Sequence, residues 1–297
     1  MTSEQDGSNA PSNKRNGFDI SRCAVPAPKK QCKVPKASSL MSGYRFVCPP
    51  SAEVSRKLGA ASLAMGFDIE THDLAGPGGG GSGRFGHPWR SNPSIFQLRL
   101  VQIGWAIGGC AMEDPITSQE ERLVKPQGFQ ISKMATEKRG INNEHAKENG
   151  LLLSDALGEF MQAAWQIHES GGIVVSHHIE FDAGIIDEEL DRCGMQHWRP
   201  RWREIAIRGV CTMDPDIQSW MQYASGKEKE PGEKSLVMNL SRSVKLFFQH
   251  SSRVQDLLMR SHTAGADAEM HLLLYRALRD LAQKEKGQVK PELSGAD

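Results

Sequence analysis

Carboxylate side chains end a short apolar run near residue 70, where they could act as a pair. Asp68 and Glu70 close the segment LAMGFDIE (residues 63–70), whose apolar character is typical of a buried strand. Alternate residues of a strand point to the same face, so the two carboxylates would lie side by side. Unpaired carboxylates repel each other and are costly to bury, and a divalent cation would relieve both costs. Taken alone, the pair is equally typical of solvated acids at the end of a strand.

Two further acids stand at the expected starts of helices. Asp182 follows a β-branched segment (residues 173–177) that is typical of a buried strand, and it opens an amphipathic stretch over residues 181–193. By itself, an acid in a first helical turn is explained by its favourable interaction with the helix dipole. Asp267 lies five residues after His262, at the opening of the last expected helix. By itself, His262 could equally cap that helix or pack in the core.

Taken together, the three motifs resemble those of a known enzyme family. The matching segments are Phe67-Asp68-Ile69-Glu70-Thr71, His177-x-x-x-Phe181-Asp182 and His262-x-Ala264-x-x-Asp267-Ala268. In order and spacing they are similar to the motifs of DnaQ-like 3′→5′ exonucleases of the DEDDh type, in the ribonuclease H-like superfamily. The resemblance covers roughly residues 64–281. The sequence departs from the usual motifs at His72 and His178, which bears on substrate fit rather than on the chemistry.

The resemblance implies hydrolysis of phosphodiester bonds from the 3′ end of DNA or RNA, with release of nucleoside 5′-monophosphates. It implies two divalent metal ions, Mg²⁺ or Mn²⁺, which prefer hard oxygen ligands and together clamp the attacking and leaving oxygens. The implied metal ligands are Asp68, Glu70, Asp182 and Asp267, with His262 as the general base. A histidine with its ordinary pKa of about 6.5 suits proton removal near neutral pH. The residues expected beside the substrate are Thr71, His72 and Phe181.

The alternative function is a catalytically silent module of the same fold that binds nucleic acid or protein. Such a module has no need for four acids that are costly to hold together. A metal phosphatase of another fold is excluded, because Asp68-Ile69-Glu70 lacks the Asp-x-Asp nucleophile motif. The expected partner is the 3′ end of a single-stranded nucleic acid, and DNA and RNA stay undistinguished because they share the phosphodiester. A homodimer and a polymerase or other protein partner stay open.

Strand and helix patterns alternate along the chain, which predicts an α/β fold with a mixed sheet. The resemblance implies the ribonuclease H-like form, with a five-stranded sheet flanked by helices. Trp105 and Tyr275 are expected in the core rather than as stacking platforms for bases, and His271 shows no ligand spacing with cysteine. The expected strands are residues 63–70, 98–109, 122–124 and 173–177, and the expected helices are residues 151–168, 181–193, 235–248 and 264–284, with a stop at Gly287.

Charge is balanced over the whole chain and unbalanced along it. The 297 residues carry 36 Lys and Arg against 36 Asp and Glu, which argues against a protein that coats nucleic acid. Residues 1–60, however, hold ten basic and four acidic residues, a net charge of +6. This polar, proline-dotted stretch predicts a disordered basic tail. The exonuclease domain is then expected over residues 61–286, with a disordered C-terminus over residues 287–297.

Three further patterns bear on location and on loops. Within the tail, residues 26–36 resemble a nuclear-targeting patch, and a solvated linker explains them equally well. A glycine-rich segment (residues 76–93) contains the spacing G-x-G-x-x-G but is followed by prolines, so we interpret it as a flexible insertion rather than a phosphate loop. Six cysteines without a CxxC pair, no apolar signal segment and no long apolar run predict an intracellular protein, nuclear or cytoplasmic, without a membrane span. The basic tail favours the nucleus.

Overall fold

A five-stranded mixed sheet forms the centre of the structure, a computed structural model that describes residues 51–73, 97–224 and 238–288. The order across the sheet is β3-β2-β1-β4-β5. β2 pairs antiparallel with both β1 and β3, whereas β4 pairs parallel with β1, and β5 pairs parallel with β4. This mixed sheet confirms the expected α/β fold. The strands are β1 (Leu63–Thr71), β2 (Leu100–Gly109), β3 (Ile116–Leu123), β4 (Ile173–Ser176) and β5 (Val210–Cys211).

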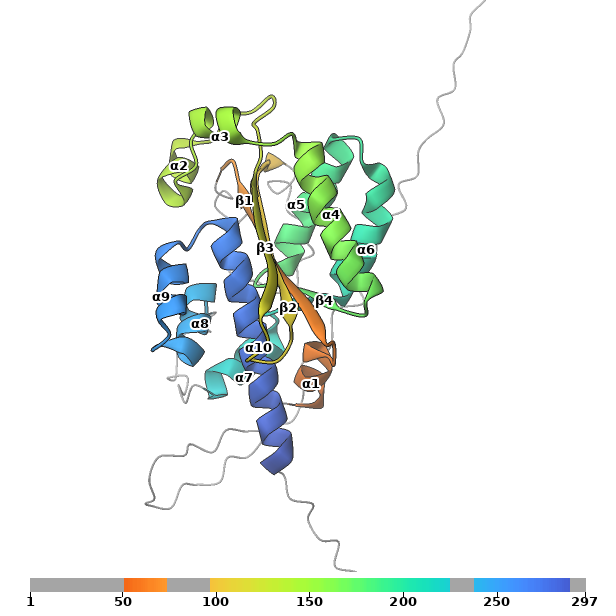
Figure 1. Ribbon diagram of the computed structural model, residues 1–297, viewed down its shortest axis with the longest axis vertical. Helices are drawn as coiled ribbons and strands as arrows, with labels where there is room; N and C mark the ends of the chain where they lie inside the picture. Colours follow the sequence, from red (N-terminus) through yellow and green to blue (C-terminus); the bar gives the residue numbers. More distant parts are fainter. Residues whose placement is uncertain (1–50, 74–96, 225–237, 289–297) are drawn as a thin grey trace, which may run out of the picture. The chain divides into compact units, whose positions relative to one another are not determined.

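Helices cover both faces of the sheet, which Figure 1 shows nearly edge-on. α4, α5 and α6 pack on one face, and α10 packs on the other together with α1, α7, α8 and α9. α2 and α3 form a small separate layer at one end. The helices are α1 (Ala52–Leu58), α2 (Lys133–Arg139), α3 (Asn143–Asn149), α4 (Leu153–Glu169), α5 (Ile179–Arg192), α6 (Arg199–Arg208), α7 (Pro215–Ala224), α8 (Leu240–Phe248), α9 (Ser252–Met259) and α10 (Ala264–Gln288).

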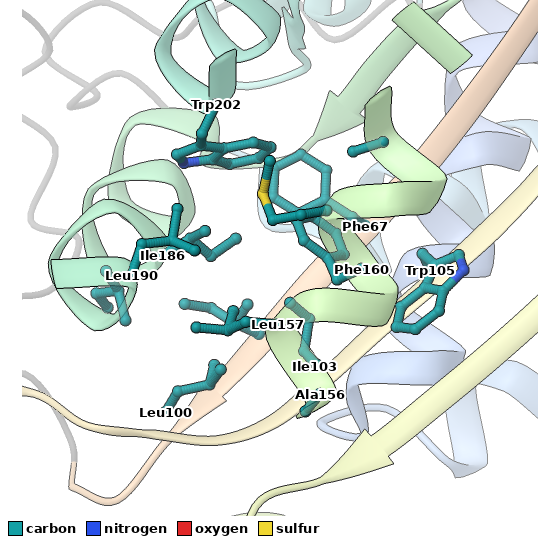
Figure 2. Packing of buried hydrophobic residues seen from close by; sticks show 14 of the residues in the cluster. Phe67, Leu100, Ile103, Trp105, Ala156, Leu157, Phe160, Ile186, Leu190 and Trp202 are labelled. Atoms are coloured by element: carbon teal, nitrogen blue, oxygen red, sulfur yellow. The ribbon is translucent and has the colours of Figure 1, made fainter. Parts of the chain in front are cut away.

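One face of β1 contributes to the more aromatic of the two main cores. Met65, Phe67 and Ile69 alternate along the strand and point beneath α4, α5 and α6. The ring of Phe67 lies 5.7 Å from that of Phe160 and 5.6 Å from that of Trp202, at the tilted and edge-on angles that aromatic pairs prefer (Figure 2). The apolar alternation predicted for this strand therefore anchors β1 and leaves its other face for other contacts.

The opposite face of β1 lies against α10 at unusually close range. It carries Gly66, followed on the same side by Asp68 and Glu70. A side chain at Gly66 would overlap backbone atoms of α10, and one at Gly104, the β2 residue paired with Asp68, would overlap the backbone at Ala264. Glycine at both positions lets the helix backbone approach the strands directly. This approach places the first turn of α10 beside the two carboxylates.

The folded part begins before the expected boundary at residue 61. α1 lies in the range that we predicted to be a disordered tail, and it buries Val54 and Leu58 against the layer of α10. The hydroxyl of Tyr275 donates a 2.7 Å hydrogen bond to the carbonyl of Leu58. The expected range of residues 1–60 is therefore wrong at its C-terminal end. With two buried residues inside a basic stretch, α1 has too few apolar positions to give a periodic signal.

Several other elements differ from expectation because they are short or polar. β3 begins at Ile116 rather than at residue 122, and its residues alternate between half-buried and exposed because it is an edge strand. α2, α3, α6, α7 and α9 were not expected, and each is ten residues or shorter. α5 begins two residues earlier than predicted, and α10 continues through the expected stop at Gly287. Trp105 and Tyr275 are buried in the core, as predicted.

Several sequence features lie outside the described residues. They are the basic stretch before residue 51, the glycine-rich insertion, the start expected for α8 at residue 235 and the end of the chain after residue 288. Within the described residues, Cys110, Cys193 and Cys211 are free thiols. Among the described helices, none combines the length and apolar character needed to cross a membrane.

Candidate active site

The first two predicted ligands lie where β1 meets the N-terminus of α10. Asp68 pairs with Gly104 and Glu70 with Gln102 in the register of β1 against β2. The register shifts between Glu70 and Thr71, where the strand pairing ends. The side chain of Glu70 is 8% exposed, and that of Asp68 is 16% exposed. Both carboxylates of the first motif are thus held largely out of water, on the face that receives α10.

The sheet also binds the free backbone N–H groups of the first turn of α10. The N–H of Ala264 donates to the side-chain oxygen of Gln102 at 2.9 Å, and that of Gly265 donates to Glu121 of β3 at 2.8 Å. A helix N-terminus has such unpaired donors, and satisfying them fixes its position. Asp267 in this first turn is therefore placed by contacts from two strands.

The third motif meets the first in space. One potential ligand atom from each of Glu70, His262 and Asp267 lies within 4.8 Å of the others. Both carboxylate oxygens of Asp267 accept from the backbone N–H of His262 at 3.3 Å. His262 is exposed and has a φ of 71°, the only positive φ of a non-glycine residue in the described part of the chain. This left-handed conformation is unfavourable for histidine. Because His262 is exposed, it does not pack in the core, which was one of the roles that the sequence left open.

Asp182 of the second motif joins the site from the start of α5. It is 5% exposed, and it accepts a hydrogen bond from the hydroxyl of Ser176, the last residue of β4. Because β4 runs parallel to β1, its end lies at the same edge of the sheet as the end of β1. An acid that served only the helix dipole would be solvated, and Asp182 is buried.

Burial and mutual repulsion strongly perturb the acids. Burial raises the pKa of Asp68 well above its ordinary value, and the charges of Asp267, Asp182 and Glu70 raise it further. Burial likewise raises the pKa of Asp182 to about 7 and that of Asp267 to about 7, each with a contribution from Glu70. These mutual effects show that the four predicted acids share one electrostatic environment. Perturbed carboxylates of this kind are typical of functional sites.

A buried histidine lies next to Asp68 and stacks on a second buried histidine. The Nδ1 atom of His271 is 2.7 Å from the carbonyl oxygen of Phe67, and its Nε2 atom is 4.0 Å from Asp68. Its ring stacks on that of His177 at 6.3 Å. Burial lowers the pKa of His271 to about 3 and that of His177 to about 4, so both are neutral at pH 7. Sequence spacing did not single out His271, although it lies one helical turn after Asp267.

Arg139 enters the site from α2 and was not predicted. Its Nε donates to Glu70, and its Nη2 donates to the hydroxyl of Thr71 at 3.3 Å. The charge of Arg139 opposes the effect of burial, which nevertheless raises the pKa of Glu70. The only sequence signal was a basic pair, Lys138-Arg139, before Gly140, which caps α2 with a φ of 72°.

The three residues expected beside the substrate have different surroundings. Thr71 is 2% exposed, and its hydroxyl donates to the carbonyl of Asp73 at 2.7 Å. The ring of His72 accepts from the backbone N–H of Arg99 at 3.1 Å. Phe181 is half-buried and lies parallel to the ring of His178, with 5.7 Å between their centroids. These rings lie close to the acids in sequence, and their contact with a substrate stays a prediction.

The donor set fits a hard divalent cation. Four buried or nearly buried carboxylates offer oxygen ligands, which Mg²⁺ and Mn²⁺ prefer. Arg139 partly neutralises Glu70. The raised pKa values of the other three acids show that the positive charge nearby does not compensate for their burial and mutual repulsion. A bound cation would supply that charge. The side chains therefore suit a metal site, as the sequence predicts.

Comparisons with known proteins identify the fold. Neither family models nor curated protein sequences match this chain. A structure of exonuclease I is similar, with a TM-score of 0.51 and 15% identity over 76% of this chain and 43% of that one.

The structure of E. coli exonuclease I in complex with a dT13 oligonucleotide has a TM-score of 0.50 and 14% sequence identity. The match covers 76% of this chain and 43% of that one. The structure of cell-death related nuclease 4 has a TM-score of 0.46 and 13% sequence identity, over 74% of this chain and 64% of that one. The chain thus matches less than two thirds of the length of each. The sheet order and the likeness to exonuclease I show that the chain has the ribonuclease H-like fold.

Proposed function

We propose that this protein is a metal-dependent 3′→5′ exonuclease that releases nucleoside 5′-monophosphates. The observation that carries the proposal is the convergence of three sequence motifs on one buried acidic site. Glu70, His262 and Asp267 lie within 4.8 Å of one another, and Asp68 and Asp182 share their electrostatic environment. The fold of exonuclease I supports the same class of reaction.

In the proposed mechanism the acids bind metal and His262 acts as the general base. Asp68, Glu70, Asp182 and Asp267 would hold two divalent ions, which when bound supply Lewis-acid activation and charge neutralisation for phosphodiester displacement. His262 accepts the proton of the attacking water at its ring. Burial, aided by the charges of Lys138 and Arg139, lowers the pKa of His262, so the ring is neutral and basic at pH 7. Its exposure leaves it accessible to water and to a strand end.

Single-stranded nucleic acid is the proposed substrate. The exonuclease I structure at a TM-score of 0.50 was determined with a dT13 oligonucleotide, and the proposal extends that substrate class to this chain. Phe181, the residue before Asp182, forms a stacked pair of rings with His178. Stacking on aromatic side chains is how proteins commonly hold unpaired bases, which supports these rings as contacts for the strand.

A labelled-oligonucleotide assay tests the proposal. Full-length protein with Mn²⁺ should shorten a 5′-labelled single strand one nucleotide at a time, and EDTA should stop it. Asp68→Asn should abolish cleavage, whereas Asp155→Asn on the exposed face of α4 should leave it unchanged. Matched DNA and RNA strands, single and double, would define the substrate. Tight binding of the strand without shortening at any Mn²⁺ concentration would instead identify a silent binding module.

A further inference from the structure

An arginine is bound inside the candidate metal site. The side chain of Arg139 is only 9% exposed, and it contacts Glu70, one of the proposed metal ligands, through Nε. Its Nη2 reaches Thr71, the next residue of β1. A guanidinium is always charged at physiological pH, so Arg139 supplies a fixed positive charge where a cation is expected.

One nitrogen of the Arg139 guanidinium has no hydrogen-bond partner among the described residues. This atom is Nη1, and it is buried. A buried donor without a partner is costly, and the contact with Glu70 is what offsets that cost. The arrangement of the arginine is therefore favourable only while Glu70 is free to accept from it.

The helix that carries Arg139 is weakly anchored. α2 buries only Ala135, and α3 after it buries only Ala146. The two helices pack through a small cluster with Ile131, Ile141 and Val101, apart from the two larger cores. Elements with few buried apolar contacts open and shift at low cost in free energy. Arg139 can therefore leave Glu70 without disturbing the sheet.

We propose that Arg139 is an internal cation that competes with the divalent metal for Glu70. In the metal-free protein it neutralises Glu70 and stabilises the crowded carboxylates. When a divalent ion binds Glu70, the like charge of the guanidinium is repelled and Arg139 withdraws with α2. The inference rests on the proposed function, because it takes Glu70 as a metal ligand.

Calorimetric titration of Mn²⁺ into full-length protein tests the competition. Arg139→Gln should bind Mn²⁺ about 10-fold more tightly than wild type, or tighter still, because a charge-assisted contact no longer has to be broken. Lys138→Gln is the matched control. It removes the same charge from the neighbouring exposed position, without a hydrogen bond to Glu70, and should change the affinity less than about 5-fold.

Thermal unfolding provides a second, activity-free measurement. In EDTA, Arg139→Gln should melt several degrees below wild type and Lys138→Gln, and saturating Mn²⁺ should close that gap. Arg139→Lys keeps the charge but loses the planar fork, and it should bind Mn²⁺ with intermediate affinity. If Arg139→Gln fails to fold, the Mn²⁺ affinity of Arg139→Lys still tests the competition.

The possible outcomes separate this inference from the proposed function. If wild type and Arg139→Gln bind Mn²⁺ equally and both shorten the oligonucleotide, the competition is wrong and the exonuclease stands. Weaker Mn²⁺ binding by Arg139→Gln would show that Arg139 positions Glu70 for the metal, and it would overturn the competition. If neither protein binds Mn²⁺, both proposals fall.

Discussion

His262 combines a chemical role with an unfavourable backbone conformation. Its φ of 71° is held by the bonds from its N–H to Asp267, so one acid fixes the conformation of the proposed base. Such left-handed residues persist only where surrounding contacts enforce them, and they often mark functional sites. Asparagine tolerates this conformation better than most residues, which allows the ring to be removed without adding backbone strain.

His262→Asn should therefore lose about 10²- to 10⁴-fold in turnover, the typical contribution of a general base. Its Mn²⁺ affinity and melting temperature should stay near those of wild type, because the four acids and the backbone conformation remain. Single-turnover kinetics on a labelled oligonucleotide, together with calorimetry, would measure both. Turnover equal to that of wild type would remove His262 from the mechanism.

At the scale of elements, the site depends on how closely α10 packs on β1 and β2. Gly104 lies under the first turn of α10, where an added Cβ would overlap the backbone of Ala264 and Gly265. Those two residues are the ones bound by Gln102 and Glu121. A change in this strand should therefore move the turn that carries Asp267.

Gly104→Ala should destabilise the protein by about 1–3 kcal/mol, the usual cost of overpacking, and should also reduce exonuclease activity. Gly158→Ala in α4 is the matched control, because nothing lies within 4 Å of the added methyl group. It should stabilise the protein by about 0.5–1 kcal/mol, since alanine is the better helix former. Urea unfolding of both variants checks the difference, and similar effects at the two positions would contradict the close packing.

At the scale of the whole molecule, the acidic site makes stability depend on pH. Asp182 and Asp267 have an ordinary pKa of 3.8 and a folded pKa raised to about 7 by burial. Between those values the folded protein binds more protons than the unfolded chain does. Its metal-free stability therefore falls as pH rises from about 4 to about 7 and then levels off.

In EDTA, wild type should lose melting temperature from pH 5 to pH 8 relative to Asp267→Asn, which removes one titrating group. Calorimetric or fluorescence melts across this range would measure the difference. Parallel pH profiles for the two proteins would show that Asp267 has no raised pKa.

Added Mn²⁺ should reverse the loss at pH 8 and have little effect at pH 5. Metal ligands must be deprotonated, so binding competes with protons at the lower pH. The shift in melting temperature with Mn²⁺ at each pH provides the measurement, and Asp155→Asn should behave like wild type. An equal Mn²⁺ shift at pH 5 and pH 8 would exclude these carboxylates as the ligands.

The sequence by itself determined the main strands and the grouping of the acids. Alternation placed Met65, Phe67 and Ile69 on one face of β1 and left Asp68 and Glu70 on the other, because the strand period is fixed by backbone geometry. The motif order predicted that His262 and Asp267 would join them, and the structure brings His262, Asp267 and Glu70 together. The roles of these residues in binding metal and substrate stay predictions, as does the nuclear location.

Only the tertiary structure decided which other side chains reach the site. Arg139 lies 69 positions from Glu70, and His271 lies 204 positions from Phe67, so no local pattern could join them. α1 went unrecognised because it is short, and β3 was predicted only at its C-terminal end because it is a polar edge strand, stabilised by neighbours rather than by its own periodicity. Close approach through Gly66 and Gly104, and the docking of a small helix layer, are properties of packing, which local spacing along the chain does not encode.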